Sequence, residues 1–116
     1  MSKINIGLIG TGNIAEEHIK IFQTMKNICL YGVTSKTNKF SNQIKLKYNF
    51  IKVFKNYNDM AIDKNIGALF IVVSPDQSFD VIKHIIKYKK PFFCEKPAGL
   101  SLNEAKILKK LYLKYK

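Results

Sequence analysis

A glycine-rich turn stands between an apolar run and an amphipathic stretch near the start of this 116-residue chain. The turn is Gly10-Thr11-Gly12-Asn13-Ile14-Ala15, and the β-branched run before it, residues 3–9, is interpreted as a buried first strand. A strand, a Gly-x-Gly-x-x-Ala turn and a helix, in that order, are typical of the site that binds the pyrophosphate of a dinucleotide. This pattern restricts the fold most, because it specifies a strand and a helix joined by one tight turn.

Each small residue of the turn has a physical role in such a site. Gly10 permits the tight turn, Gly12 lets the backbone approach the phosphates, and Ala15 allows the helix to pack closely on the strand. The N–H groups near Asn13 and Ile14 would face the pyrophosphate, at the positive end of the helix dipole. The residues predicted to contact the cofactor here are Gly10, Thr11, Gly12, Asn13 and Ile14. The alternative is an ordinary turn from strand to helix with no ligand.

Apolar runs alternate with helical patterns along the rest of the chain. Strands are expected at residues 3–9, 28–34, 51–54, 67–73 and 91–94. Helices are expected after the glycine turn, at residues 39–48, 58–63 and 78–89, and from Ser101 onward. Runs without polar alternation suit parallel strands that are covered on both faces. Right-handed crossovers then predict an α/β fold, a Rossmann-type doubly wound parallel sheet with strand order 3-2-1-4-5, as one domain over residues 1–116.

Periodicity also predicts which side of each helix is apolar. The first helix is expected to bury Ile14, His18, Ile21, Phe22 and Met25, and the second Phe40, Ile44 and Leu46. Ser101 and Glu104 form a capping-box pattern at the start of the last helix, which is expected to cover the sheet rather than lie on a membrane. Cys29 and Cys94 lie in apolar runs and are expected to be reduced, buried side chains.

Composition excludes several classes of protein. The net charge is +12, but all 20 basic residues are lysines. Arginine makes most bidentate contacts to bases and phosphates, so its absence argues against a sequence-specific nucleic-acid-binding protein. No apolar run approaches the roughly 18 residues of a membrane span, and no leader pattern is present. We therefore expect a cytoplasmic protein with no membrane association.

The region after the second strand predicts which dinucleotide is preferred. A site for NAD usually has an acidic residue there that accepts hydrogen bonds from the ribose hydroxyls. This chain has no acidic residue between Glu17 and Asp59, and Ser35 and Lys36 stand at the expected place. A hydroxyl and an ammonium group suit a 2′-phosphate, so the hypothesis is a preference for NADP over NAD, with both residues binding the cofactor. The alternative is that lysine is simply common in this chain.

The segments after the fourth and fifth strands carry a more specific pattern. Ser74 and Pro75 follow the fourth strand, and the fifth continues into the triplet Glu95-Lys96-Pro97. Together with the opening Gly-Leu-Ile-Gly-Thr-Gly-Asn-Ile-Ala, the segment Lys-Pro-Phe-Phe-Cys-Glu-Lys-Pro resembles the Gfo/Idh/MocA family of glucose–fructose oxidoreductases and inositol dehydrogenases. The resemblance extends over essentially all 116 residues.

The resemblance implies an NAD(P)-dependent oxidoreductase that transfers hydride to or from a hydroxyl or carbonyl of a sugar or cyclitol. It places Lys96 beside the nicotinamide and the substrate as the catalytic residue, where its ammonium group can hydrogen-bond the reacting oxygen. Glu95 would orient Lys96 or contact the cofactor, and Ser74 and Pro75 would lie against the nicotinamide ribose. His18 matches a histidine of the family but, on an apolar helical face, is interpreted as structural.

The chain departs from the family pattern in two ways. Phe79 stands where members often have a histidine. Members also continue into a second α/β domain that provides the substrate wall, the oligomer interface and the usual catalytic aspartate and histidine, and this domain is expected to be absent here. Two interpretations stay open: a truncated part of an oxidoreductase, or a non-catalytic dinucleotide-binding module that acts through a partner. The open edge of the fifth strand would allow pairing with another chain, including a second copy.

Overall fold

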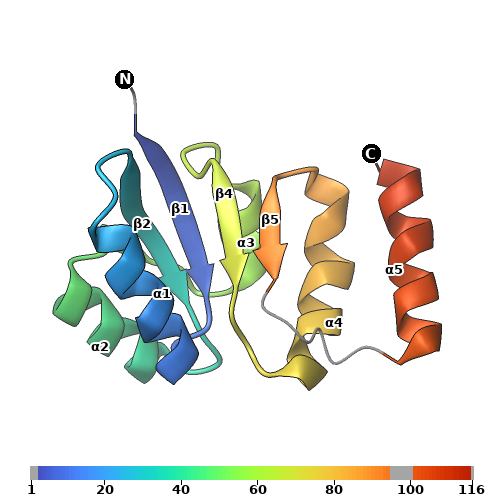
Figure 1. The fold of residues 1–116 in the computed structure, drawn as a ribbon, viewed down its shortest axis with the longest axis horizontal. Coiled ribbons are helices and arrows are strands. Elements are labelled where there is room, and N and C mark those ends of the chain that lie inside the picture. Colours follow the sequence, from blue (N-terminus) through green and yellow to red (C-terminus); the bar gives the residue numbers. More distant parts are fainter. Residues whose placement is uncertain (1–2, 95–100, 116) are drawn as a thin grey trace.

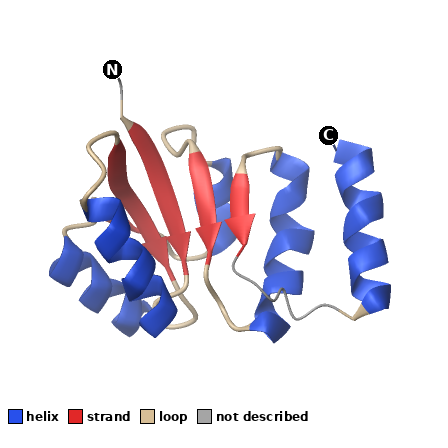
Figure 2. Ribbon diagram, in the orientation of Figure 1, coloured by secondary structure: helices blue, strands red, loops and turns tan. Residues whose placement is uncertain are grey.

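The computed structural model describes residues 3–94 and 101–115. Within these ranges, five parallel strands form one sheet in the order β3-β2-β1-β4-β5, with helices on both faces (Figures 1 and 2). The predicted doubly wound α/β class and its strand order are confirmed. The elements are β1 (Ile4–Ile9), α1 (Asn13–Gln23), β2 (Ile28–Thr34), α2 (Asn38–Tyr48), β3 (Lys52–Val53), α3 (Tyr57–Ile62), β4 (Ala68–Ile71), α4 (Pro75–Ile85), the 3-10 helix η1 (Ile86–Tyr88), β5 (Phe92–Cys94) and α5 (Leu102–Tyr115).

The central strand β1 sets the alignment of the sheet. Leu8 is opposite Val33 of β2 on one side and Phe70 of β4 on the other. Because every pairing is parallel, all strands end at the same edge, which is the lower edge in Figure 1. The loops that leave this edge are therefore brought together from distant parts of the sequence.

Each face of the sheet has its own apolar core. On one face, Leu8 packs in a cluster with Ala15 and Ile19 of α1 and Ile44 of α2. On the other face, the next residue, Ile9, belongs to a cluster whose further members include residues of β4, α3, α4 and η1. Successive side chains of a strand point to opposite faces, so one apolar strand serves both cores.

Two glycines let the second core lie unusually close to the sheet. Gly7 of β1 and Gly32 of β2 are opposite each other in the ladder. A Cβ atom on Gly7 would lie 2.6 Å from the sulfur of Met60, and one on Gly32 would lie 2.4 Å from the ring of Phe54. Met60 and Phe54 therefore pack directly on the backbone of the sheet, where any larger residue at the glycines would displace them.

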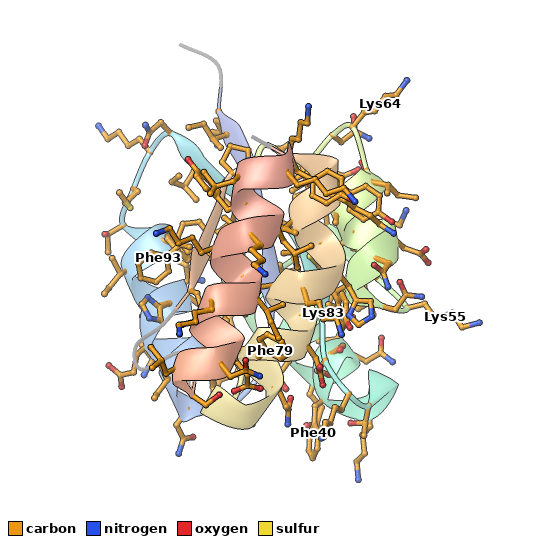
Figure 3. All side chains as sticks on the ribbon, turned by 90° about the vertical axis from the view of Figure 1, so that its right-hand side faces the viewer. Phe40, Lys55, Lys64, Phe79, Lys83 and Phe93 are labelled. Carbon is orange, nitrogen blue, oxygen red and sulfur yellow. The ribbon has the colours of Figure 1, made fainter. Side chains whose placement is uncertain are left out.

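The buried sides of α1 and α2 differ from the prediction. On α1, Ala15, Ile19 and Phe22 are buried, whereas Ile14 and Ile21 are 57% and 59% exposed. Met25 is also exposed. On α2, Ile44 is buried as expected, together with Ser41 and Tyr48, but Phe40 and Leu46 are exposed. Phe40 extends from the lower end of the molecule in Figure 3.

The helix after β4 begins earlier than expected. It starts at Pro75 rather than at Ser78, because Ser74 is its N-cap and a proline is favourable in the first turn. The α-helix ends at Ile85, and the 3-10 helix η1 completes the predicted segment apart from Lys89.

The last helix, α5, begins with the predicted capping box. The Glu104 N–H donates to Ser101 Oγ at 3.1 Å, and the Ser101 N–H donates to Glu104 Oε1 at 3.2 Å. Leu108, Leu111 and Tyr115 pack against the core that α4 and η1 help to form. The helix thus widens the helical layer beside α4 instead of covering the sheet by itself (Figure 1).

Two further predictions concern the cysteines and membrane association. Cys29 and Cys94 are not joined by a disulfide, and both are partly rather than fully buried. Of the helices in the described ranges, none combines the length and apolar character that a membrane span requires.

Candidate functional site

The glycine turn lies at the carboxyl edge of the sheet, between the ends of β2 and β4. Gly10 is buried and has a φ of +118°, which favours glycine. Its N–H donates to the Thr34 carbonyl at 2.8 Å, and a Cβ atom on it would lie 2.3 Å from the Val72 carbonyl oxygen. The turn is therefore fixed to both neighbouring strands, which positions the start of α1.

The start of α1 is open to a ligand. Gly12 is the N-cap, no described side chain caps the helix, and a Cβ atom on Gly12 would meet nothing within 4 Å. Asn13 and Ile14, the first two residues of α1, are exposed. The N–H groups of a first helical turn have no acceptor within the helix, so they are available to an anion. Thr11, partly buried, precedes the cap.

The carboxylate in this first turn is directed away from the open end. Glu16 accepts hydrogen bonds from Lys47 Nζ at 2.9 Å and from Tyr48 Oη at 2.7 Å, both on α2. The bonds from Lys47 and then Tyr48 lower the pKa of the Glu16 carboxyl below its ordinary value. The negative charge nearest the turn is thereby partly neutralised, which reduces its competition with a bound phosphate.

The loop after β2 presents one polar group that is engaged and one that is free. The Ser35 hydroxyl donates to the Thr37 carbonyl at 2.7 Å and lies 2.6 Å from Ser41 Oγ. Lys36 is exposed, and no described residue forms a hydrogen bond or ion pair with its ammonium group. Ser35 therefore shapes the loop, while Lys36 has a charge available for a ligand.

A cavity of about 500 Å³ separates this loop from α4. Thr34, Ser35 and Lys36 line it from the end of β2. The opposite wall includes Gln77 and Asp80 of α4. A cavity of this size at the carboxyl ends of parallel strands, beside the glycine turn, is suited to the nucleoside part of a dinucleotide.

The third wall of the cavity was not foreseen from the sequence. It is formed by Lys55 and Asn56 of the loop that follows β3, and by Tyr57 at the start of α3. A strand was predicted here, at residues 51–54, so the rule that ligands bind at the carboxyl ends of strands would have identified this loop if it had been applied to β3.

Tyr57 connects this wall to α4. Its hydroxyl lies 3.4 Å from His84 Nδ1, and the same nitrogen lies 2.6 Å from the Asp80 carbonyl oxygen. Burial raises the pKa of Tyr57, and the nearby negative charge of Asp80 raises it further. The phenol is therefore a neutral hydrogen-bonding group of the cavity at neutral pH.

The remaining predicted site residues follow β4 and β5. Ser74 is exposed, and its carbonyl accepts hydrogen bonds from the N–H groups of Gln77 at 2.9 Å and Ser78 at 3.2 Å. Pro75 is the first residue of α4. Glu95 and Lys96 lie outside the described residues. No group of three histidine, cysteine or carboxylate side chains that could hold a metal ion occurs in the described part of the chain.

His18 lies among aromatic rings. Its ring centroid is 6.3 Å from that of Phe22 and 6.0 Å from that of Phe93. Phe22 and Phe93 also contact Phe70 of β4. Figure 3 places Phe93 on the side of the sheet that α1 covers. These contacts give His18 a packing role.

Comparison with known proteins agrees with this geometry. Residues 4–116 match the Gfo/Idh/MocA model, described as an oxidoreductase family with an NAD-binding Rossmann fold. The chain is 27% identical over 99 residues to a myo-inositol 2-dehydrogenase of Thermotoga maritima, covering 85% of this chain and 30% of the relative. It is 35% identical over 114 residues to a glucose-6-phosphate 3-dehydrogenase of Bacillus subtilis, covering 90% of this chain and 29% of the relative.

A solved structure supports the fold independently. Levoglucosan dehydrogenase in complex with NADH and L-sorbose superposes with a TM-score of 0.88 at 16% sequence identity, over 99% of this chain and 33% of that one. The chain thus spans about a third of the length of these relatives.

Proposed function

Because the chain belongs to the Gfo/Idh/MocA oxidoreductase family, with its NAD-binding Rossmann fold, we propose that it forms the cofactor-binding domain of an NAD(P)-dependent oxidoreductase. One observation carries the proposal: the uncapped first turn of α1, with open space beside Gly12, lies at the same carboxyl edge of the sheet as a cavity lined by Ile9 and Ser35. The bound nicotinamide would supply or accept the hydride.

The proposed site residues would contact different parts of the cofactor. Thr11 and the N–H groups of Asn13 and Ile14 would bind the pyrophosphate, and the cavity would hold the adenosine. Ser74 and Pro75 would lie against the nicotinamide ribose. The role of Ser74 is consistent with its exposure at the N-terminus of α4.

The cofactor is proposed to be NADP in preference to NAD. Ser35 and Lys36 line the cavity at the end of β2, and the described part of that loop offers no carboxylate to the ribose hydroxyls. Charge-assisted hydrogen bonds to a phosphate contribute about 1.5–3 kcal/mol each, so one ammonium group suffices for a tenfold preference. The engaged hydroxyl of Ser35 would support the loop that presents Lys36.

Calorimetric titration of the chain with NADPH and, separately, NADH at matched salt tests both parts. We expect NADPH to bind at least tenfold more tightly, and Lys36→Glu to reverse that ratio, because the new carboxylate repels the phosphate and accepts from ribose hydroxyls. Equal binding of both cofactors would remove the NADP preference. Binding of neither would contradict the cofactor-binding role itself.

The substrate is proposed to be a sugar or cyclitol, as the names of the relatives suggest. Lys96 would hydrogen-bond the reacting oxygen and assist transfer of its proton, and Glu95 would orient Lys96. A second α/β domain, in the same protein or on a partner, would complete the substrate pocket. These 116 residues alone are then expected to bind cofactor weakly and to turn over little.

A non-catalytic dinucleotide-binding module is the second candidate, favoured by the position of β5 at the outer edge of the sheet that the described residues form. Turnover of a sugar and cyclitol panel distinguishes the two, since cofactor affinity is expected from both. Efficient turnover by this chain alone would contradict the need for a second domain.

A further inference from the structure

The loop after β3 lies beside the loop after β2 because the two strands are hydrogen-bonded neighbours. Val53 is opposite Val33, and the Phe54 N–H donates to the Val33 carbonyl at 2.9 Å. The next residue, Lys55, lines the same cavity as Lys36. Two lysines from loops 19 positions apart in sequence thus border one end of the cavity.

Both ammonium groups are available to a ligand. Lys36 and Lys55 are exposed, and neither has a hydrogen bond or ion pair with a described residue. Lys55 extends outward from its loop in Figure 3, clear of neighbouring side chains. Two other lysines are engaged: Lys47 pairs with Glu16, and Lys90 donates to two backbone carbonyls at 2.6 Å each.

The charges around this end of the cavity favour a phosphate. The described cavity lining contains one carboxylate, Asp80, which lies on α4, whereas the lysines are on the β2 and β3 loops. The hydroxyl of Ser35, which also lines the cavity, already donates its hydrogen bond to the Thr37 carbonyl. The charged hydrogen-bond donors still available at this end are therefore the two ammonium groups, and a dianionic phosphate can accept hydrogen bonds from both.

We propose that Lys55 is a second specificity-determining residue, which reads the 2′-phosphate of NADP together with Lys36. The inference rests on the proposed cofactor-binding function and adds the β3 loop to the β2 loop as a source of selectivity. Removal of Lys36 alone then weakens the preference for NADPH without abolishing it, because Lys55 still contacts the phosphate.

The test compares Lys55→Gln, Lys36→Gln and the double variant with a matched control. Lys52→Gln is that control, because Lys52 is exposed, lies three positions earlier and does not line the cavity. Glutamine keeps much of the aliphatic part of the lysine side chain and removes its charge. Calorimetry with NADPH and NADH at fixed ionic strength measures both affinities for each variant, and circular dichroism confirms that each is folded.

We expect Lys55→Gln to lower the affinity for NADPH about tenfold and to change that for NADH less than twofold. The double variant should bind both cofactors equally, and Lys52→Gln should match the wild type. If the wild type prefers NADPH but Lys55→Gln retains that preference, or loses both affinities equally, the role of Lys55 is overturned while the proposed function stands. If the wild type binds neither cofactor, the proposed function fails first.

Discussion

At the scale of single residues, two glycines of one turn are constrained in different ways. Gly10 has a positive φ and no room for a Cβ atom beside the Val72 carbonyl. Gly12 has an ordinary φ of −78° and open space around it. The first glycine is therefore required by the fold, and the second by the ligand that is proposed to lie against it.

Alanine substitutions should separate these two requirements. Gly10→Ala is expected to cost at least about 2 kcal/mol in the free energy of unfolding, through backbone strain and the clash with Val72. Gly12→Ala should cost about 1 kcal/mol or less, as a poorer N-cap, yet weaken NADPH binding because its methyl group occupies the space in which the phosphate is proposed to lie. Urea unfolding and calorimetry measure the two effects. Equal destabilisation by both substitutions would contradict this distinction.

At the scale of secondary-structure elements, the network of Glu16, Lys47 and Tyr48 joins the beginning of α1 to the end of α2. The folded protein lowers the pKa of Glu16 below its ordinary value of 4.5. Since the ionised form is favoured in the folded state, its stabilisation is fully present above the ordinary pKa. It is lost as the pH falls through the lower pKa of the folded state.

Thermal unfolding between pH 6 and pH 3 should reveal this contribution. The melting temperature of the wild type should fall more steeply with acid than that of Glu16→Gln, and the two should converge at the acid end. Glu17→Gln is the matched control, because Glu17 is exposed one position along the same helix. If Glu16→Gln has the same pH profile as the wild type, the network does not stabilise the folded state.

Elements also show what the sequence could and could not predict. β2 was predicted with its observed ends, and the strand order followed from chain handedness. The buried sides of α1 and α2 were predicted only in part: Phe22 and Ile44 are buried as expected, but a chain rich in isoleucine offers more than one apolar stripe per helix. Ile14 and Ile21 belong to the exposed stripe, and Ala15 and Ile19 to the buried one. Of the residues that line the cavity, Ser35 and Lys36 were predicted from the sequence. The residues that follow the two-residue strand β3 were not.

At the scale of the whole molecule, the effect of the net charge of +12 on binding differs from the effect of the local charge of the cavity. The molecule extends 38 Å along its longest axis, and α5 and α2 lie towards opposite ends of that axis in Figure 1. At physiological salt, interactions between exposed charges are largely screened beyond about 8 Å. Lysines of α5 should therefore attract polyanions in general but contribute little to a bound cofactor.

Neutralising Lys109 and Lys110, both exposed on α5, tests this separation. The double glutamine variant should elute earlier than the wild type from a cation-exchange column, yet bind NADPH within twofold of it at 150 mM salt. Lys36→Gln, with one charge removed, should change NADPH affinity more than this variant does with two. A loss of NADPH affinity proportional to net charge would instead make recognition of the phosphate non-specific.

The glycine pair of β1 and β2 has a consequence for how this domain can evolve. Gly7 and Gly32 leave space that Met60 and Phe54 fill, and Phe54 immediately precedes the loop that forms one wall of the cavity. A larger residue at either glycine could be accepted only after its partner had become smaller. Gly7 and Met60 must therefore change together during evolution, and so must Gly32 and Phe54. The width of the cavity is thus inherited in part from two glycines that do not line it.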